Sequence, residues 1–195
     1  MTTFNGLAEP WMLEGAGVPP RLRAATFATA DATASIQRAR AFFDARGVER
    51  GRAFVLLGPT GVGKSWAGAA IVNADIVANA AADRLFFPDS EPWWTSCAQL
   101  VDDLRDFSTR RDAMCRARRA RLLVLDDVQR PSDADFPLFE RVLSVREQDE
   151  RAVLITSNLP KKEFYSAVGA RVVDRLRAWG ETHEIRGPSL RGEKS

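Results

Sequence analysis

The stretch of this sequence best suited to bind a ligand is the glycine-rich loop GPTGVGKS, at residues 58–65. It follows the apolar run AFVLL and opens an alanine-rich segment typical of a helix. Glycines let backbone N–H groups turn inward around phosphate oxygens, and the first turn of a helix adds its positive end. Lys64 would reach the β- and γ-phosphates, and the Ser65 hydroxyl would bind Mg²⁺. The spacing therefore predicts a nucleoside triphosphate site, whereas a plain glycine turn would not need Lys64.

Two carboxylates at the end of a second apolar run are candidates for the same site. The run LLVLDD ends in Asp126 and Asp127, and phosphate sites form at the carboxyl ends of buried strands. We expect Asp126 to hold Mg²⁺ through water and Asp127 to polarise the attacking water. Many ATPases place Glu at the second position, and Asp is shorter, so ATP hydrolysis is expected to be slow. The alternative for either acid is the N-cap of a following helix.

The polar pair Ser-Asn closes a third apolar run, AVLITSNLP at residues 152–160. Such a pair at the end of a buried strand is unusual unless it faces something. Asn158 could hydrogen-bond the γ-phosphate or the attacking water, although Asn before Leu-Pro is also a turn signal.

Two arginines four residues apart, Arg171 and Arg175, lie on one face of a predicted helix. One interpretation is a solvated face whose arginines pair with Asp174 or a glutamate. The other is an arginine finger aimed at the nucleotide of a neighbouring subunit.

Apolar strands alternate with helical patterns along most of the chain. The predicted strands are residues 53–57, 84–88, 121–127, 152–156 and 182–186; the predicted helices are one that ends at Gly47 and those at residues 64–83, 95–107, 136–148 and 161–179. Strands that are apolar along their whole length are buried on both faces. The pattern therefore indicates an α/β fold, with a parallel sheet and helices on both of its faces.

Length and composition fit one domain: the chain has 195 residues, of which 45% are hydrophobic, and a net charge of only +2. Residues 1–23 are rich in turn formers, and we interpret them as an arm in which Trp11, Met12 and Leu13 pack on the body or on a partner. Two cysteines and one histidine cannot build a metal cluster at ligand spacing. No apolar run has membrane length and no secretory signal is visible, so we expect a cytoplasmic protein without a membrane partner.

Taken in order, these motifs resemble the AAA+ ATPases of the DnaC/IstB group, which are helicase loaders and transposition helpers. The resemblance covers residues 18–191 and rests on GPTGVGKS, LLVLDD, TSNLP and GARVVDRL at family-like spacing. The approach VPPRLRAATF, at residues 18–27, and the closing EIRGPSLR, at residues 184–191, add to it. The loop by itself is unspecific, but the series is fairly specific.

The resemblance implies a P-loop NTPase fold of the AAA+ type over residues 24–195, with a five-stranded parallel sheet and no C-terminal lid domain. Asn158 would be sensor 1, Arg175 the preferred trans arginine with Arg171 beside it, and Arg191 a second phosphate-sensing arginine. The full set of implied nucleotide contacts is Gly58, Pro59, Thr60, Gly61, Val62, Gly63, Lys64, Ser65, Trp66 and Arg191, with Ser65 and Asp126 for the metal.

The activity that this resemblance implies is ATP binding and hydrolysis, with ATP and Mg²⁺ as cofactors. The protein would assemble as a homo-oligomer through the trans arginine and load a replicative helicase on single-stranded DNA during DNA replication. One departure from the group is the N-terminus: where members usually carry a partner-binding domain, this sequence has a short arm.

An arginine cluster is the candidate for contact with single-stranded DNA. The segment at residues 108–122 has one acid, Asp112. Its arginines are Arg110, Arg111, Arg116, Arg118, Arg119 and Arg121. They could follow a phosphate backbone, and Trp93 and Trp94 could stack on bases. The alternatives are a solvated helix face and core aromatics; the role of Arg146 is open.

Other functions share the same loop. An IstB-like protein would use the same motor to activate a transposase, and only the partner separates it from a helicase loader. A nucleotide-gated binding module with little turnover would be consistent with Asp127. A small-molecule kinase fits poorly, because it would not need the two acids, the Ser-Asn pair and the paired arginines in this order.

Overall fold

A five-stranded, all-parallel sheet forms the centre of the fold in the computed structural model, which describes residues 3–4, 7–28, 33–82 and 91–190. In spatial order the strands are β4 (Trp93–Ser96), β5 (Leu122–Asp126), β6 (Ala152–Ser157), β3 (Ala53–Leu57) and β7 (Gly180–Glu184). Every side chain of the central strands β3 and β6 is buried, as expected for strands with apolar side chains on both faces. The predicted parallel sheet is confirmed.

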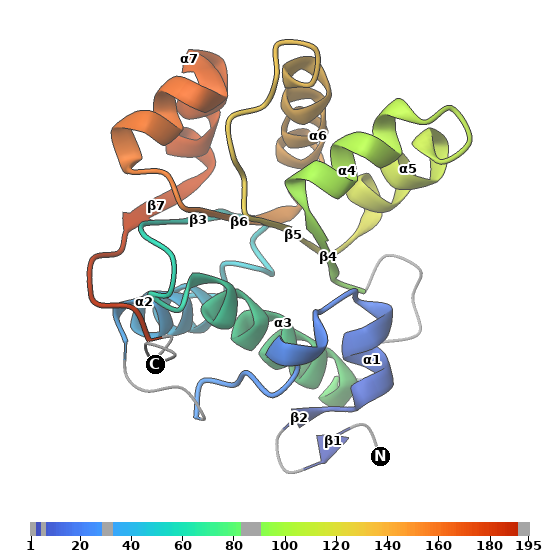
Figure 1. Cartoon of the computed structure of the whole chain (residues 1–195). Coiled ribbons are helices and arrows are strands. Elements are labelled where there is room, and N and C mark those ends of the chain that lie inside the picture. Colours follow the sequence, from blue (N-terminus) through green and yellow to red (C-terminus); the bar gives the residue numbers. More distant parts are fainter. Residues whose placement is uncertain (1–2, 5–6, 29–32, 83–90, 191–195) are drawn as a thin grey trace.

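Helices cover both faces of this sheet, in two layers that Figure 1 shows above and below the strands. One layer holds α1 (Pro10–Gly15), the short 3-10 turn η1 (Pro20–Leu22), α2 (Ala34–Asp44) and α3 (Lys64–Ala81). The other holds α4 (Cys97–Arg105), α5 (Arg110–Arg119), α6 (Phe136–Gln148) and α7 (Lys161–Trp179). Each layer encloses its own apolar core against one face of the sheet.

The edge strand was not predicted from the sequence. It is β4, at Trp93–Ser96, and the helix expected to begin at residue 95 begins at Cys97. The strand predicted at residues 84–88 lies outside the described residues. Because alternate residues of a strand face opposite sides, Trp94 packs into one core and Trp93 into the other, with 5% and 7% of each residue exposed. The idea that these tryptophans stack on DNA bases is therefore wrong.

The N-terminal segment packs against α3. A short hairpin, β1 (Thr3–Phe4) with β2 (Leu7–Ala8), leads into α1, and the backbone N–H of Ala8 donates to Asn73 Oδ1 at 2.8 Å. Leu13 is buried in the core and Met12 packs against it, whereas Trp11 is 66% exposed. The boundary between an arm and a domain at residue 23 stays a prediction.

Most of the arginine cluster has partners within the chain. On α5, Arg118 pairs with Asp149 at 2.6 Å, and just after α5, Arg121 pairs with the buried Asp75 at 3.0 Å. Arg116 donates to the carbonyl of Gly15 at 2.7 Å and lies over the ring of Trp93. These contacts fasten α5 to the rest of the fold, and contact between the cluster and DNA stays a prediction.

Arg146, whose role the sequence leaves open, is fully buried on α6. Its guanidinium donates to the carbonyl oxygens of Ala117 at 2.6 Å, Arg121 at 3.4 Å and Ala152. It therefore joins the end of α5 to the starts of β5 and β6. Burial lowers the pKa of Arg146 to about 9, which still leaves it protonated at neutral pH.

Replacing Arg146 with alanine is expected to destabilise the fold by about 3 kcal/mol, because buried carbonyl oxygens would lose their donors. Urea unfolding followed by circular dichroism measures the change. Arg141→Ala, at an exposed position of the same helix, is the matched control and should leave the midpoint in place. Equal midpoints for the two variants would contradict a structural role for Arg146.

Candidate functional site

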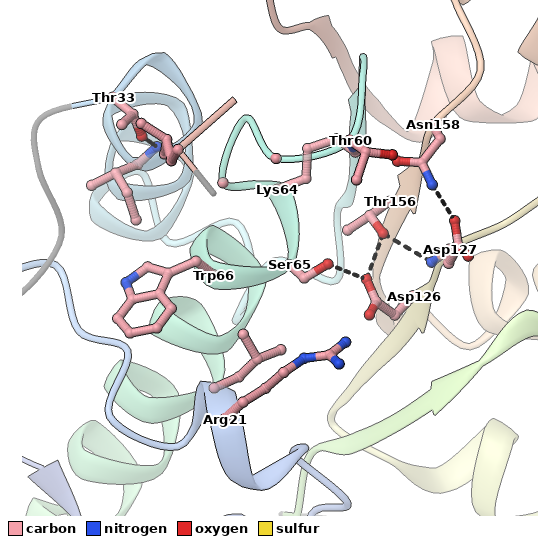
Figure 2. Close-up of a pocket in the computed structure, with 15 residues that line it drawn as sticks. Arg21, Thr33, Thr60, Lys64, Ser65, Trp66, Asp126, Asp127, Thr156 and Asn158 are labelled. Atoms are coloured by element: carbon pink, nitrogen blue, oxygen red, sulfur yellow. Dashed lines mark hydrogen bonds between the residues drawn. The ribbon is translucent and has the colours of Figure 1, made fainter. Parts of the chain in front are cut away.

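The carboxyl ends of β3, β5 and β6 open into a cavity of about 770 Å³. Parallel strands that end at the same edge of a sheet bring together residues far apart in sequence. Figure 2 shows Ser65, near the start of α3, facing Asp126 at the end of β5, with Thr156 of β6 beside them; Lys64, the first residue of α3, reaches toward Asn158 just after β6. The cavity therefore contains three of the motifs that the sequence singles out.

The loop at residues 58–65 has the backbone that a phosphate-binding loop needs. Gly63 immediately precedes α3 with φ of 85°, in the left-handed region that favours glycine. Lys64 is buried, with 7% of the residue exposed, and its ammonium donates to the carbonyls of Gly58 and Pro59, both at 2.8 Å. It also donates to Asn158 Oδ1 at 3.0 Å, so the loop and the end of β6 share one cation.

Ser65 and Asp126 meet as the sequence predicts. The Ser65 hydroxyl donates to Asp126 Oδ1 at 2.8 Å, and the Thr156 hydroxyl donates to the same oxygen at 2.6 Å. A hydroxyl and a carboxylate at hydrogen-bond distance are oxygen donors of the kind that Mg²⁺ prefers, so these residues fit that metal. Thr156 was missed from the sequence, where it reads as an ordinary β-branched strand residue.

Asp127 has an unusual backbone conformation, with φ of 56°. Its N–H donates to Thr156 Oγ1 at 3.0 Å, and its Oδ1 accepts from Asn158 Nδ2 and from Gln129 Nε2, each at 2.7 Å. A positive φ outside glycine is uncommon but several-fold enriched for Asp and Asn. Asn158 thus bridges Lys64 and Asp127, and Gln129, which carried no signal in the sequence, holds the same carboxylate.

The other end of the cavity is less polar. Trp66, predicted as a nucleotide contact, lies there with Thr33 (Figure 2), and Leu22, Ile36 and Leu190 complete the lining. A cavity with charged groups at one end and apolar side chains at the other suits a nucleotide, whose phosphates are charged and whose base is flat and largely apolar. Apart from Trp66, none of these residues was predicted to contact the nucleotide, although Leu22 and Leu190 lie in stretches that add to the resemblance.

The segment after β7 crosses the phosphate-binding loop. The backbone N–H of Leu190 donates to the carbonyl of Gly61 at 2.9 Å, and a Cβ added at Gly61 would lie 2.1 Å from Ser189 Oγ. Glycine at this position thus permits the close approach. Arg191 lies outside the described residues, so its phosphate-sensing role stays a prediction.

The two candidate trans arginines lie on α7, and neither lines the cavity of its own chain. Helix α7 is interrupted at Gly169, with φ of 76° and ψ of 158°, so both arginines belong to its second half. Arg175 pairs with Glu147 of α6, whereas Arg171 is exposed and has no ion pair within the described part of the chain.

Comparison with known families gives a match to the IstB-like ATP binding proteins over residues 27–195. Among solved structures, the DnaC helicase loader superimposes with a TM-score of 0.69 at 21% identity, covering 86% of this chain and 100% of that one. DnaI gives 0.69 at 22% identity, covering 89% and 94%. AMPPCP-bound DnaA from Aquifex aeolicus gives 0.63 at 18%, covering 86% and 50%. These matches confirm the predicted P-loop NTPase fold of the AAA+ type.

Among curated proteins, none matches this sequence. In the part of the chain that the structure describes, no helix combines the length and the apolar character needed to cross a bilayer.

Proposed function

This chain belongs to the IstB-like ATP binding protein family, and on that premise we propose that it is an ATPase that loads a replicative helicase on single-stranded DNA. The observation that carries the ATPase part is the convergence of Lys64, Ser65, Asp126, Asp127 and Asn158 on one cavity. No simple glycine turn requires a buried lysine, two carboxylates and an amide at the same place.

Each of these side chains has a role that its geometry supports. The loop amides and Lys64 bind the β- and γ-phosphates, and Ser65 and Asp126 hold the metal. Mg²⁺ bound with ATP would neutralise phosphate charge and favour attack at the γ-phosphate. Asp127 orients the attacking water, and the amides of Asn158 and Gln129, which both donate to its Oδ1, fix the carboxylate for this role. Asn158 fixes Asp127 relative to Lys64.

The helicase-loader part rests on the likeness of the fold to DnaC and DnaI, over most of this chain and nearly all of each of those chains. Transposase activation is the alternative, since an IstB-like protein would use the same motor. Affinity capture of the tagged protein from its host with ATP present, followed by mass spectrometry, separates the two. A ring helicase in the eluate supports the loader, and a transposase in its place overturns it.

A second candidate function is a nucleotide-gated binding module that hardly turns over. Asp127 favours it, because the side chain is shorter than Glu and its Oδ1 already accepts two amide hydrogen bonds. Turnover measured with and without single-stranded DNA distinguishes the two functions. A rate that stays at background in both conditions, with ATP bound, would favour the module.

ATP turnover by the assembled protein is expected to depend on an arginine of α7. Arg175→Ala should leave ATP binding unchanged and lower turnover roughly tenfold at protein concentrations where the chain assembles, because a charge-assisted contact to phosphate in the next subunit is lost. Arg171→Ala, tested in parallel, shows which of the two reaches the neighbouring nucleotide.

Glu147→Gln is the control for these variants, since it releases Arg175 from its ion pair without removing the guanidinium. The measurement is ATP turnover as a function of protein concentration. Loss of ATP binding and turnover together in Arg175→Ala would show that Arg175 acts within its own subunit.

A further inference from the structure

The cavity contains a second cation, to which the resemblance assigns no role. Arg21, in the turn η1 (Pro20–Leu22), lines the cavity together with Lys64, Ser65 and Asp126. In Figure 2 its guanidinium points toward Ser65 and Asp126, and it comes from the N-terminal segment, on the side away from Lys64. We propose that Arg21 binds the polyphosphate of the nucleotide; this rests on the proposed function and extends it to the N-terminal stretch VPPRLRAATF, at residues 18–27.

The turn that carries Arg21 is held in place on both sides. Leu22 is buried in the core beside α3. The Arg23 side chain folds back, donating to the carbonyl of Val18 at 3.0 Å and to Glu14 at 3.4 Å. The side chains of these three consecutive residues thus point in different directions: Arg21 into the cavity, Leu22 into the core, and Arg23 onto the preceding backbone. The backbone that presents Arg21 is therefore positioned before any ligand arrives.

The charged residues that line the cavity indicate what Arg21 could bind. The acids of its described lining, Asp126 and Asp127, face one lysine, whose ammonium already binds two carbonyls and Asn158. Within the described part of the chain Arg21 forms no ion pair. A guanidinium offers a planar fork of donors that matches phosphate oxygens, which a lysine does not. A nucleotide polyphosphate is the ligand in this cavity that would satisfy it.

The same residue would connect the nucleotide to the N-terminal segment. The carbonyl of Ala16 accepts from the N–H of Trp94 at 2.7 Å, and that of Ala25 accepts from Asn73 at 3.2 Å. A phosphate bound by Arg21 therefore adds a further contact to a segment already tied to β4 and α3.

Titration of the full chain with MgATP, MgADP and magnesium pyrophosphate tests the proposal. Arg21→Gln keeps most of the side-chain length but removes the charge, and is expected to bind all three roughly tenfold more weakly than wild type. Arg21→Lys should recover part of the loss. Arg38→Ala, an exposed arginine of α2 that does not line the cavity, is the control and should bind like wild type.

Melting temperatures without nucleotide should be equal for wild type and Arg21→Gln, because Arg21 is exposed. Unchanged affinity of Arg21→Gln for MgATP would overturn the proposal. Weaker binding of the nucleotides with unchanged binding of pyrophosphate would also overturn it, since Arg21 would then contact the sugar or base. Failure of wild type to bind MgATP would instead remove the proposed function.

Discussion

Replacing Lys64 with alanine is expected to abolish ATP turnover, with a loss on the order of 10³-fold or more, because the charge that balances the transferred phosphoryl group is removed. The buried ammonium binds two carbonyls of its own loop and Asn158. The alanine variant therefore loses the cation and also the link between the loop and the end of β6. Phosphate release at saturating MgATP measures turnover, and titration with a fluorescent ATP analogue measures binding.

Lys162→Ala is the matched control, because Lys162 is an exposed lysine near the start of α7 and does not line the cavity. It should hydrolyse ATP at the wild-type rate. A Lys64→Ala variant that is folded and hydrolyses ATP as fast as this control would show that the cavity is not the ATPase site.

Asp127→Asn is expected to lower turnover by about 10³-fold while ATP binding is retained, since an amide cannot accept a proton from water. In this substitution, an effect on the chemical step can be separated from an effect on folding. Asn tolerates the positive φ of this position as readily as Asp, and it has the same size. Single-turnover hydrolysis with an excess of protein measures the chemical step directly.

Asp133→Asn, in the exposed loop that follows β5, removes the same charge outside the cavity and should be silent. If Asp127→Asn hydrolysed ATP as fast as Asp133→Asn, the water would be oriented by another group. Loss of ATP binding along with turnover would show instead that Asp127 contributes to the binding of nucleotide.

The sequence predicted the half of the site that belongs to the sheet. Apolar runs end in Gly58, Asp126 and Ser157, and strands that are buried on both faces have only one arrangement of their carboxyl ends, side by side. A pattern of three strands was therefore enough to bring Lys64, Asp126 and Asn158 together. Thr156 was not predicted, because its hydroxyl reaches Asp126 only through the register in which β6 pairs with its neighbours.

Apart from Trp66, the residues that line the less polar end of the cavity, and Arg21, could not be predicted. Arg21 and Leu190 lie in stretches that add to the resemblance, but no local pattern places them or Ile36 at the nucleotide, because their three segments meet only through tertiary packing. Strand β4 was not predicted for a related reason: Trp93 and Trp94 lie beside a proline-containing stretch, and their burial on two opposite faces is visible only once β5 is their neighbour. Local patterns do not contain that pairing.

The central strand β3 has consequences for how the chain is made. It is finished at Leu57, but its two neighbours in the sheet, β6 and β7, begin at Ala152 and Gly180. At roughly 5–20 residues per second, a ribosome needs several seconds to deliver the first of them, and pairing over such distances is slow to form. During that interval the nascent chain already contains the whole phosphate-binding sequence without a strand on either side to fix it. Messages truncated before β6 would thus yield products that carry every residue of the loop and do not bind nucleotide.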